Sequence, residues 1–317
     1  MRAVLAACVL LGSLLATACT TPPGHGWESR LRGDAVVLLG EVHDNAPLHR
    51  RRLQVLERAL AGGWRPVIVM EQFDRERQAD IERARRDRPG DPQHVIDAAT
   101  TPARPGGGWN WDFYRPVVAL ALRYDLPLIA ANLSRADTGR IARGGLATVF
   151  DESERVALGL DRPIAADWRL AQERAIDAGH CHALPPAAWP RMADAQFARD
   201  AVMTRMLRRH AAGGAVLLAG NGHVRRDLGV PRWLATDSPT PHRITPGRLL
   251  AIGFLEEGDD ATPATAFDAV VRAPAAVRAD PCAGFGAAPA GPDRSRRPIG
   301  RGWRAASAGG RRRCFKT

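Results

Sequence analysis

Two apolar segments of this chain run into the same short pattern, Gly-x-x-His. The first segment, Ala35–Glu41, leads to His43, and the second, Ala215–Gly220, leads to His223. Each segment has the length and the aliphatic composition of a buried strand. Parallel strands of an α/β sheet end at one edge, and ligands bind outside that edge. The sequence therefore predicts two imidazoles at a ligand-binding edge.

Carboxylates accompany these histidines. Glu41 lies two residues before His43, on the same side of an extended strand. Glu71 ends a third apolar segment, and three adjacent strands would bring it to Glu41, His43 and His223. Two imidazoles with one or two carboxylates suit a divalent metal such as Zn, Mn or Fe, or a metal-bearing cofactor. A bound metal would acidify a water and leave one glutamate as a general base, so these four are candidate catalytic residues of a metal-dependent hydrolase.

An aromatic cluster is the second feature with chemical potential. Trp109, Trp111 and Tyr114 fall within six residues, although only 6% of the chain is aromatic. Core packing is the ordinary explanation. The alternative is an aromatic wall for a flat ligand, with Tyr114 as a phenolate ligand of ferric haem. The only other tyrosine, Tyr124, precedes a buried strand and is assigned to the core.

Further candidates lie in the second half of the chain. His182 stands in a Gly/Pro/His-rich interruption of a helical region and is a candidate ligand contact. Arg225 lies two residues after His223 and is a candidate partner for ligand carboxylates such as haem propionates. Each has a simpler explanation, a structural histidine or a solvated arginine. Gln196, Arg199 and Asp200 share one face of a predicted helix.

Alternating strand and helix patterns surround these residues. They predict an α/β fold with a parallel or mixed sheet flanked by helices. A helical insertion, or subdomain, is predicted at about residues 134–212, between two strands. The strands are predicted at Ala35–Glu41, Pro66–Glu71, Leu126–Leu133, Ala215–Gly220, Leu249–Leu255 and Ala266–Arg272, the last two at the edge of the sheet.

The two ends of the chain differ from this core. Residues 1–18 are predicted to be a signal peptide that ends in a lipobox, with Cys19 as the lipidated residue. Cleavage by the ordinary signal peptidase would instead leave a periplasmic protein. Residues 19–33 are predicted to be a tether, 34–275 the ligand-binding domain, and 276–317 a disordered tail rich in Arg, Ala, Gly and Pro.

The net charge of +11 is concentrated in the tail. Residues 292–317 carry nine basic side chains and one acidic side chain, and the domain itself is nearly neutral. A binding face for nucleic acid needs basic residues on the folded surface. No nucleic-acid partner is therefore predicted.

Five motifs in order resemble the ChaN family of haem-binding lipoproteins, which is grouped with Tiki-like and erythromycin-esterase-like proteins. They are Leu-Leu-Gly-Glu-Val-His-Asp-Asn (38–45), Glu-Gln-Phe-Asp (71–74), Trp-x-Trp-x-x-Tyr-x-Pro (109–116), Ala-Ala-Asn-Leu (130–133) and Ala-Gly-Asn-Gly-His-x-Arg-x-Asp-x-Gly-Val-Pro (219–231). The arginine-rich tail is not part of the family pattern.

The resemblance implies a lipid-anchored haem-binding protein of the bacterial cell envelope, an outer-membrane lipoprotein in haem or iron uptake or trafficking. The first hypothesis is accordingly a haem-binding module without turnover, and enzymatic activity is left open. It implies tyrosine ligation of haem, carried here to Tyr114. From the residues themselves, His43, His223, His182 and Arg225 are candidate further contacts with the cofactor. It also implies a homodimer around cofacial haems and an outer-membrane haem or iron receptor as partner. In Tiki-like relatives, paired Gly-x-x-His motifs and a glutamate hold a catalytic metal. The metal-dependent hydrolase is accordingly the alternative.

Overall fold

The computed structural model describes residues 26–100, 108–236, 248–280, 282 and 283. The predicted signal peptide, Cys19 and most of the predicted tail lie outside these residues. The chain divides into a unit of residues 1–278 and a unit of residues 279–317, and the fold belongs to the first. Within the described residues, every helix is too short or too polar to cross a membrane.

One six-stranded sheet forms the centre of the described chain, in the order β3-β2-β4-β1-β5-β6. All five strand pairs are parallel, which confirms the predicted α/β architecture. The strands are β1 Val36–Leu39, β2 Val67–Asp74, β3 Leu128–Asn132, β4 Ala215–Leu218, β5 Leu249–Glu256 and β6 Ala269–Ala273.

The placement of β5 corrects one expectation. This strand pairs with both β1 and β6, so it is an inner strand, and only β6 lies at that edge. Its residues from Leu249 to Leu255 are all buried, as an inner strand requires. The continuous apolar composition of the segment was the signal for this position.

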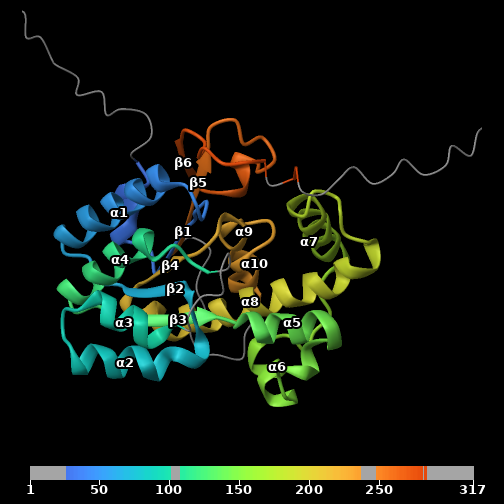
Figure 1. The fold of residues 1–317 in the computed structure, drawn as a ribbon, viewed down its shortest axis with the longest axis horizontal. Helices are drawn as coiled ribbons and strands as arrows, with labels where there is room; N and C mark the ends of the chain where they lie inside the picture. The colour runs from blue at the N-terminus through green and yellow to red at the C-terminus, as the bar shows by residue number, and fades with distance from the viewer. Residues whose placement is uncertain (1–25, 101–107, 237–247, 281, 284–317) are drawn as a thin grey trace, which may run out of the picture. The chain divides into compact units, whose positions relative to one another are not determined.

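Helices cover both faces of the sheet (Figure 1). Alternate residues of β1 divide between two cores: Val37 and Leu39 pack in one, Val36 and Leu38 in the other. The first core also takes side chains of α1 Ala46–Ala61, α2 Gln78–Asp87, α3 Pro92–Ala99 and α4 Trp111–Arg123. The second takes side chains of α8 Trp189–His210, α9 Asn221–Val224 and α10 Val230–Ala235.

A helical subdomain connects β3 to β4, as predicted. It consists of α5 Arg135–Gly144, α6 Glu152–Leu158, α7 Ala166–Gly179 and the first half of α8. Its core includes an aromatic group, with the Trp168 ring 5.3 Å from Phe197 and 5.2 Å from Trp233 of α10. The second half of α8 packs on the sheet through Met203 and Leu207. The middle of α8 is therefore held at the sheet edge where the strands end.

Short helices complete the described structure. They are η1 Glu28–Arg32, η2 Arg75–Arg77, η3 Leu146–Thr148, η4 Pro186–Ala188, η5 Ala211–Gly213 and η7 Ala264–Ala266. Leu31 of η1 is buried in the first core, so part of the segment assigned to the tether packs on the domain. Asn45 caps α1 by accepting a hydrogen bond from the amide of Leu48 at 3.0 Å.

Candidate functional site

Glu41 follows β1 and is a buried carboxylate whose two oxygens are both engaged. Its Oε1 accepts hydrogen bonds from the Tyr114 hydroxyl at 2.6 Å and from Gln72 Nε2 at 3.3 Å. Its Oε2 forms an ion pair with Arg52 of α1, which is 1% exposed. Burial alone would raise the pKa of Glu41, but Arg52 and a hydrogen bond from His43 lower it to about 2. Glu41 is therefore an anion in the folded protein.

His43 is the member of this group that faces solvent. Its side chain is 51% exposed, and its Nδ1 lies 2.7 Å from Glu41 Oε1. An ionised Glu41 only accepts hydrogen bonds, so Nδ1 carries the proton and the neutral ring has its lone pair on Nε2. Burial would lower the pKa of His43, but the hydrogen bond to Glu41 and the charge of Glu71 raise it above its ordinary value.

Backbone and aromatic contacts hold the His43 ring in place. The indole of Trp109 meets it edge-on, with 4.8 Å between ring centroids. On another side the ring lies against Gly220, where a Cβ would stand 2.9 Å from His43 Cε1. Only glycine gives the imidazole this approach to the backbone after β4. The second Gly-x-x-His motif therefore helps to position the histidine of the first.

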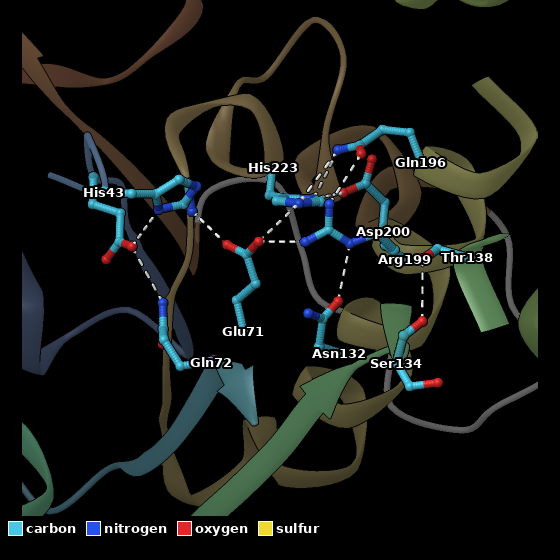
Figure 2. A network of polar contacts seen from close by, with 12 residues as sticks. His43, Glu71, Gln72, Asn132, Ser134, Thr138, Gln196, Arg199, Asp200 and His223 are labelled. Carbon is cyan, nitrogen blue, oxygen red and sulfur yellow. Dashed lines mark hydrogen bonds and ion pairs between the residues drawn. The ribbon is translucent and has the colours of Figure 1, made fainter. Parts of the chain in front are cut away.

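A second buried network starts from Glu71 of β2 (Figure 2). Its Oε2 accepts a hydrogen bond from the amide of Gly220 at 2.7 Å. Its Oε1 pairs with Arg199 and lies 3.5 Å from Nε2 of His223. Burial would raise the pKa of Glu71, but the charges of His223 and Arg199 hold it well below its ordinary value.

His223 of α9 connects Glu71 to Asp200. It is 4% exposed, and its Nδ1 lies 2.5 Å from Asp200 Oδ1. Burial and Arg199 lower the pKa of His223, whereas Glu71 and Asp200 raise it to about 9. His223 is thus a buried cation between two carboxyl groups, and it has no free nitrogen for a ligand.

Asp200 and Arg199 are site residues whose role the sequence did not reveal. Both come from the middle of α8, and Arg199 also donates its Nε–H to Asn132 Oδ1 at 2.9 Å. Asp200 is fully buried, and its Oδ2 has no hydrogen-bond partner among the described residues. The signal was the polar face formed by Gln196, Arg199 and Asp200 on a helix that is otherwise largely apolar there.

The structure brings together the four residues predicted for a metal. Glu41, His43, Glu71 and His223 meet at the carboxyl ends of the adjacent strands β1, β4 and β2. Guanidinium groups already neutralise both glutamates, and the described residues contain no group of three or more His, Cys, Asp or Glu arranged to hold a metal ion. In this structure the two carboxylates pair with histidines and arginines, and metal binding by the four residues stays a prediction.

Three further predicted contacts lie elsewhere or face inward. Tyr114, the expected haem ligand, is fully buried, and burial and the charge of Glu41 raise its pKa well above the ordinary value. Its phenol therefore orients Glu41 and is not presented to a ligand. His182 follows α7 and pairs with Asp177 at 2.6 Å. Arg225 is engaged by Asp227, with distances of 2.9 and 2.6 Å.

A buried histidine that sequence reasoning passed over supports the first network. His49 of α1 stacks on Phe113 with 4.6 Å between ring centroids, and its Nδ1 lies 3.1 Å from Arg52 Nη2. Burial and the charge of Arg52 lower the pKa of His49 to about 4, so its imidazole is neutral and accepts from the arginine. Most of the aromatic cluster thus serves packing, and Trp109 is the member that borders the exposed imidazole.

Comparisons with known proteins agree with the motifs. The family model for haem-binding uptake proteins of the Tiki superfamily, ChaN, matches residues 27–234, more than half of the chain. A solved structure of ChaN of Campylobacter jejuni, with cofacial haem binding, aligns with a TM-score of 0.58 at 17% identity. The alignment covers 77% of this chain and 89% of that one. Among curated proteins, none matches this chain.

Two further solved structures align with this chain at lower TM-scores. The type III effector HopBA1 aligns with a TM-score of 0.40 at 16% identity, over 78% of this chain and 91% of that one. An erythromycin esterase EreC variant in its open conformation aligns with a TM-score of 0.42 at 12% identity, over 75% of this chain and 76% of that one.

Proposed function

Because this chain belongs to the family of haem-binding uptake proteins of the Tiki superfamily, ChaN, we propose that it is a lipid-anchored haem-binding protein of the bacterial cell envelope that acts in haem uptake or trafficking. One observation carries the proposal for the site. His43 presents a half-exposed imidazole whose Nδ1 is held by the buried anion Glu41. The proposal also includes a homodimer and an outer-membrane haem or iron receptor as partners.

The residues around His43 fit haem. Haem, when bound, would supply an iron that accepts a lone pair from a side chain. His43 would hold it through Nε2, because a carboxylate at Nδ1 fixes the tautomer and raises the basicity of the ring. The indole of Trp109 and the partly buried Val42 would border the porphyrin with apolar surface. Of the aromatic wall inferred from the sequence, only Trp109 would then lie beside the ligand.

The same geometry argues against metal-dependent hydrolysis as the function. That mechanism needs carboxylates free to bind a metal or to activate a water. Arg52 pairs with Glu41, and Arg199 pairs with Glu71. His223 is held at both nitrogens by carboxyl groups. The site therefore supports a half-exposed imidazole as a ligand-binding group better than a metal-activated water.

Titration with ferric haem, followed by the Soret band, tests the proposal on the mature chain from residue 20. The wild type is expected to saturate at a defined stoichiometry. A Tyr114→Phe variant is expected to give the same band, because the phenol is buried against Glu41. Loss of that hydrogen bond should lower the free energy of unfolding by about 1–2 kcal/mol. A variant that folds but shows no Soret band would restore Tyr114 as the axial ligand.

The envelope location rests on the predicted signal peptide and Cys19, and a disulfide-bonded Cys181 fits an oxidising compartment. A Cys19→Ser variant is expected to move the protein from the membrane fraction to the soluble fraction, since the lipid is attached there. The matched control is Cys314→Ser, which leaves the lipobox intact and should stay with the membrane. Equal membrane recovery of both variants would contradict lipid anchoring at Cys19.

A further inference from the structure

His43 stands in the middle of a tight turn. The amide of Asn45 donates a hydrogen bond to the carbonyl of Val42 at 3.1 Å, so His43 and Asp44 are the two central residues of a β-turn. The turn connects β1 to α1, and its last residue, Asn45, caps that helix. The position of the imidazole therefore depends on what holds this turn in place.

The segment that follows β6, residues 274–278, fastens the turn and is named the strap. Asn45 is fully buried, and its Nδ2 donates a hydrogen bond to the carbonyl of Pro274 at 2.9 Å. The carboxylate of Asp44 forms an ion pair with Nε of Arg278 at 2.9 Å. Two residues of the turn are thus bound through their side chains to a segment that lies far away in the sequence.

Glu256, the last residue of β5, joins the strap to the turn. Its Oε1 accepts hydrogen bonds from Asn45 Nδ2 at 2.7 Å and from the amide of Ala276 at 2.8 Å, and it also pairs with Arg278. Hydrogen bonds in which one partner is ionised are stronger than those between neutral groups. A single carboxylate oxygen therefore gathers donors from the turn and from two residues of the strap.

The strap acts on His43 differently from the other contacts of the site. Glu41 and Gly220 lie against the imidazole itself, whereas the strap binds the two residues that follow His43 in the turn. Both β5 and the strap also lie beyond residues 27–234, the part of the chain that matches the family model. The motifs of the sequence therefore gave no indication of this contact.

We propose that Glu256 and Arg278 are positioning residues for His43: together with the strap they hold the turn so that the imidazole stays against Glu41. The contacts carry the positioning, and its consequence for ligand binding rests on the proposed haem-binding function. Without these contacts the turn opens locally, and Nδ1 of His43 leaves Glu41 for part of the time. The hydrogen bond to Glu41 fixes the Nδ1–H tautomer, so a ring that leaves it takes up the Nε2–H tautomer as well.

The tautomer of His43 therefore reports the position of its ring. Proton–nitrogen correlation NMR of the mature chain, labelled in histidine, distinguishes the two tautomers at a pH well above the pKa of His43. The wild type is expected to show the Nδ1–H form alone. Arg278→Ala and Glu256→Ala should each show a mixture of both forms, because each variant removes a connection between the strap and the turn. A His43→Ala variant assigns the signals, and circular dichroism verifies each fold.

Two controls separate the strap from a general loosening of the protein. Arg272→Ala removes an arginine of β6 that donates to the backbone carbonyl of Glu256 at 2.8 Å and has no hydrogen bond or ion pair with the turn in the described part of the chain. This variant should leave the His43 tautomer unchanged. His223, whose Nδ1 lies 2.5 Å from Asp200, is the internal control, and its signals should be the same in every variant.

Titration with ferric haem, followed by the Soret band, tests the consequence for binding. The side chains of Asp44 and Arg278 are 57% and 31% exposed, and the loss of a pair of this exposure should weaken haem binding by about twofold to fivefold. Arg272→Ala should bind haem as the wild type does.

The outcomes separate the positioning from the proposed function. A His43 tautomer that stays pure in both Arg278→Ala and Glu256→Ala, or that becomes mixed to the same extent in Arg272→Ala, would overturn the positioning and leave haem binding untouched. A mixed tautomer in Arg278→Ala, with a wild type that binds no haem, would support the positioning and overturn the proposed function. A mixed tautomer with unchanged haem affinity would support the positioning and overturn the part assigned to His43 in binding.

Discussion

A His43→Ala variant is expected to lose at least about 100-fold in affinity for ferric haem. Removing even a group that orients a metal ligand costs 10- to 100-fold, and here the ligand itself would be absent. The fold should persist, since the side chain is half exposed and Glu41 keeps Arg52, Tyr114 and Gln72 as partners. Titration of the Soret band measures the loss.

The matched control is His182→Ala. His182 is also an exposed imidazole that pairs with a carboxylate, Asp177, but it lies in the connection between α7 and α8. Its replacement should leave haem affinity unchanged. If His43→Ala binds haem as tightly as the wild type, axial ligation by His43 is wrong.

Haem affinity should also depend on pH. A protonated imidazole has no lone pair for iron, and Glu41 and Glu71 raise the pKa of His43 above 6.5. Affinity should therefore fall as the pH falls through this raised pKa. The corresponding profile should be absent from any residual binding by the His43→Ala variant.

The sequence was most informative about the sheet. All six strands lie close to their predicted positions, because continuous aliphatic runs bounded by Gly, Pro and charged residues have few other structures available. The order of the strands followed only in part. The edge position expected of β5 was wrong, since pairing between β5 and β1 depends on contacts distant in sequence.

The site was predictable in location but not in chemistry. Parallel strands made the meeting of Glu41, His43, Glu71 and His223 a consequence of topology. What their side chains do depends on Arg52 and Arg199, which come from helices and cannot be told apart by sequence from many other arginines. These two cations turn a set of metal-ligand types into two salt-bridged networks.

Replacing Arg52 with leucine should cause the largest loss of stability, about 3–5 kcal/mol in the free energy of unfolding. Arg52 is 1% exposed and is the charge partner of Glu41, so its removal leaves a buried carboxylate without a cation. Urea unfolding measures the loss. The matched control, Arg50→Leu, changes an exposed arginine of the same helix and should cost less than about 0.5 kcal/mol.

A second change separates charge from packing. Glu41→Gln in the Arg52→Leu background removes the uncompensated anion, so the double variant should recover a large part of the lost stability. If it recovers nothing, the loss comes from packing around the arginine stem. The ion pair with Glu41 would then contribute little to the free energy of unfolding.

The ion pair between Arg52 and Glu41 should also make the stability depend on pH. In the wild type the pKa of Glu41 is about 2, against an ordinary value of 4.5, so its stabilisation is present above pH 4.5 and is lost as the pH falls toward 2. Without Arg52, burial should raise the pKa of Glu41 above 4.5 in the folded protein. The variant is then destabilised mainly above pH 4.5, where Glu41 loses its proton on unfolding. The gap between wild type and Arg52→Leu should therefore be larger at pH 7 than at pH 4. An equal gap at both values would show that Arg52 does not stabilise the ionised form of Glu41.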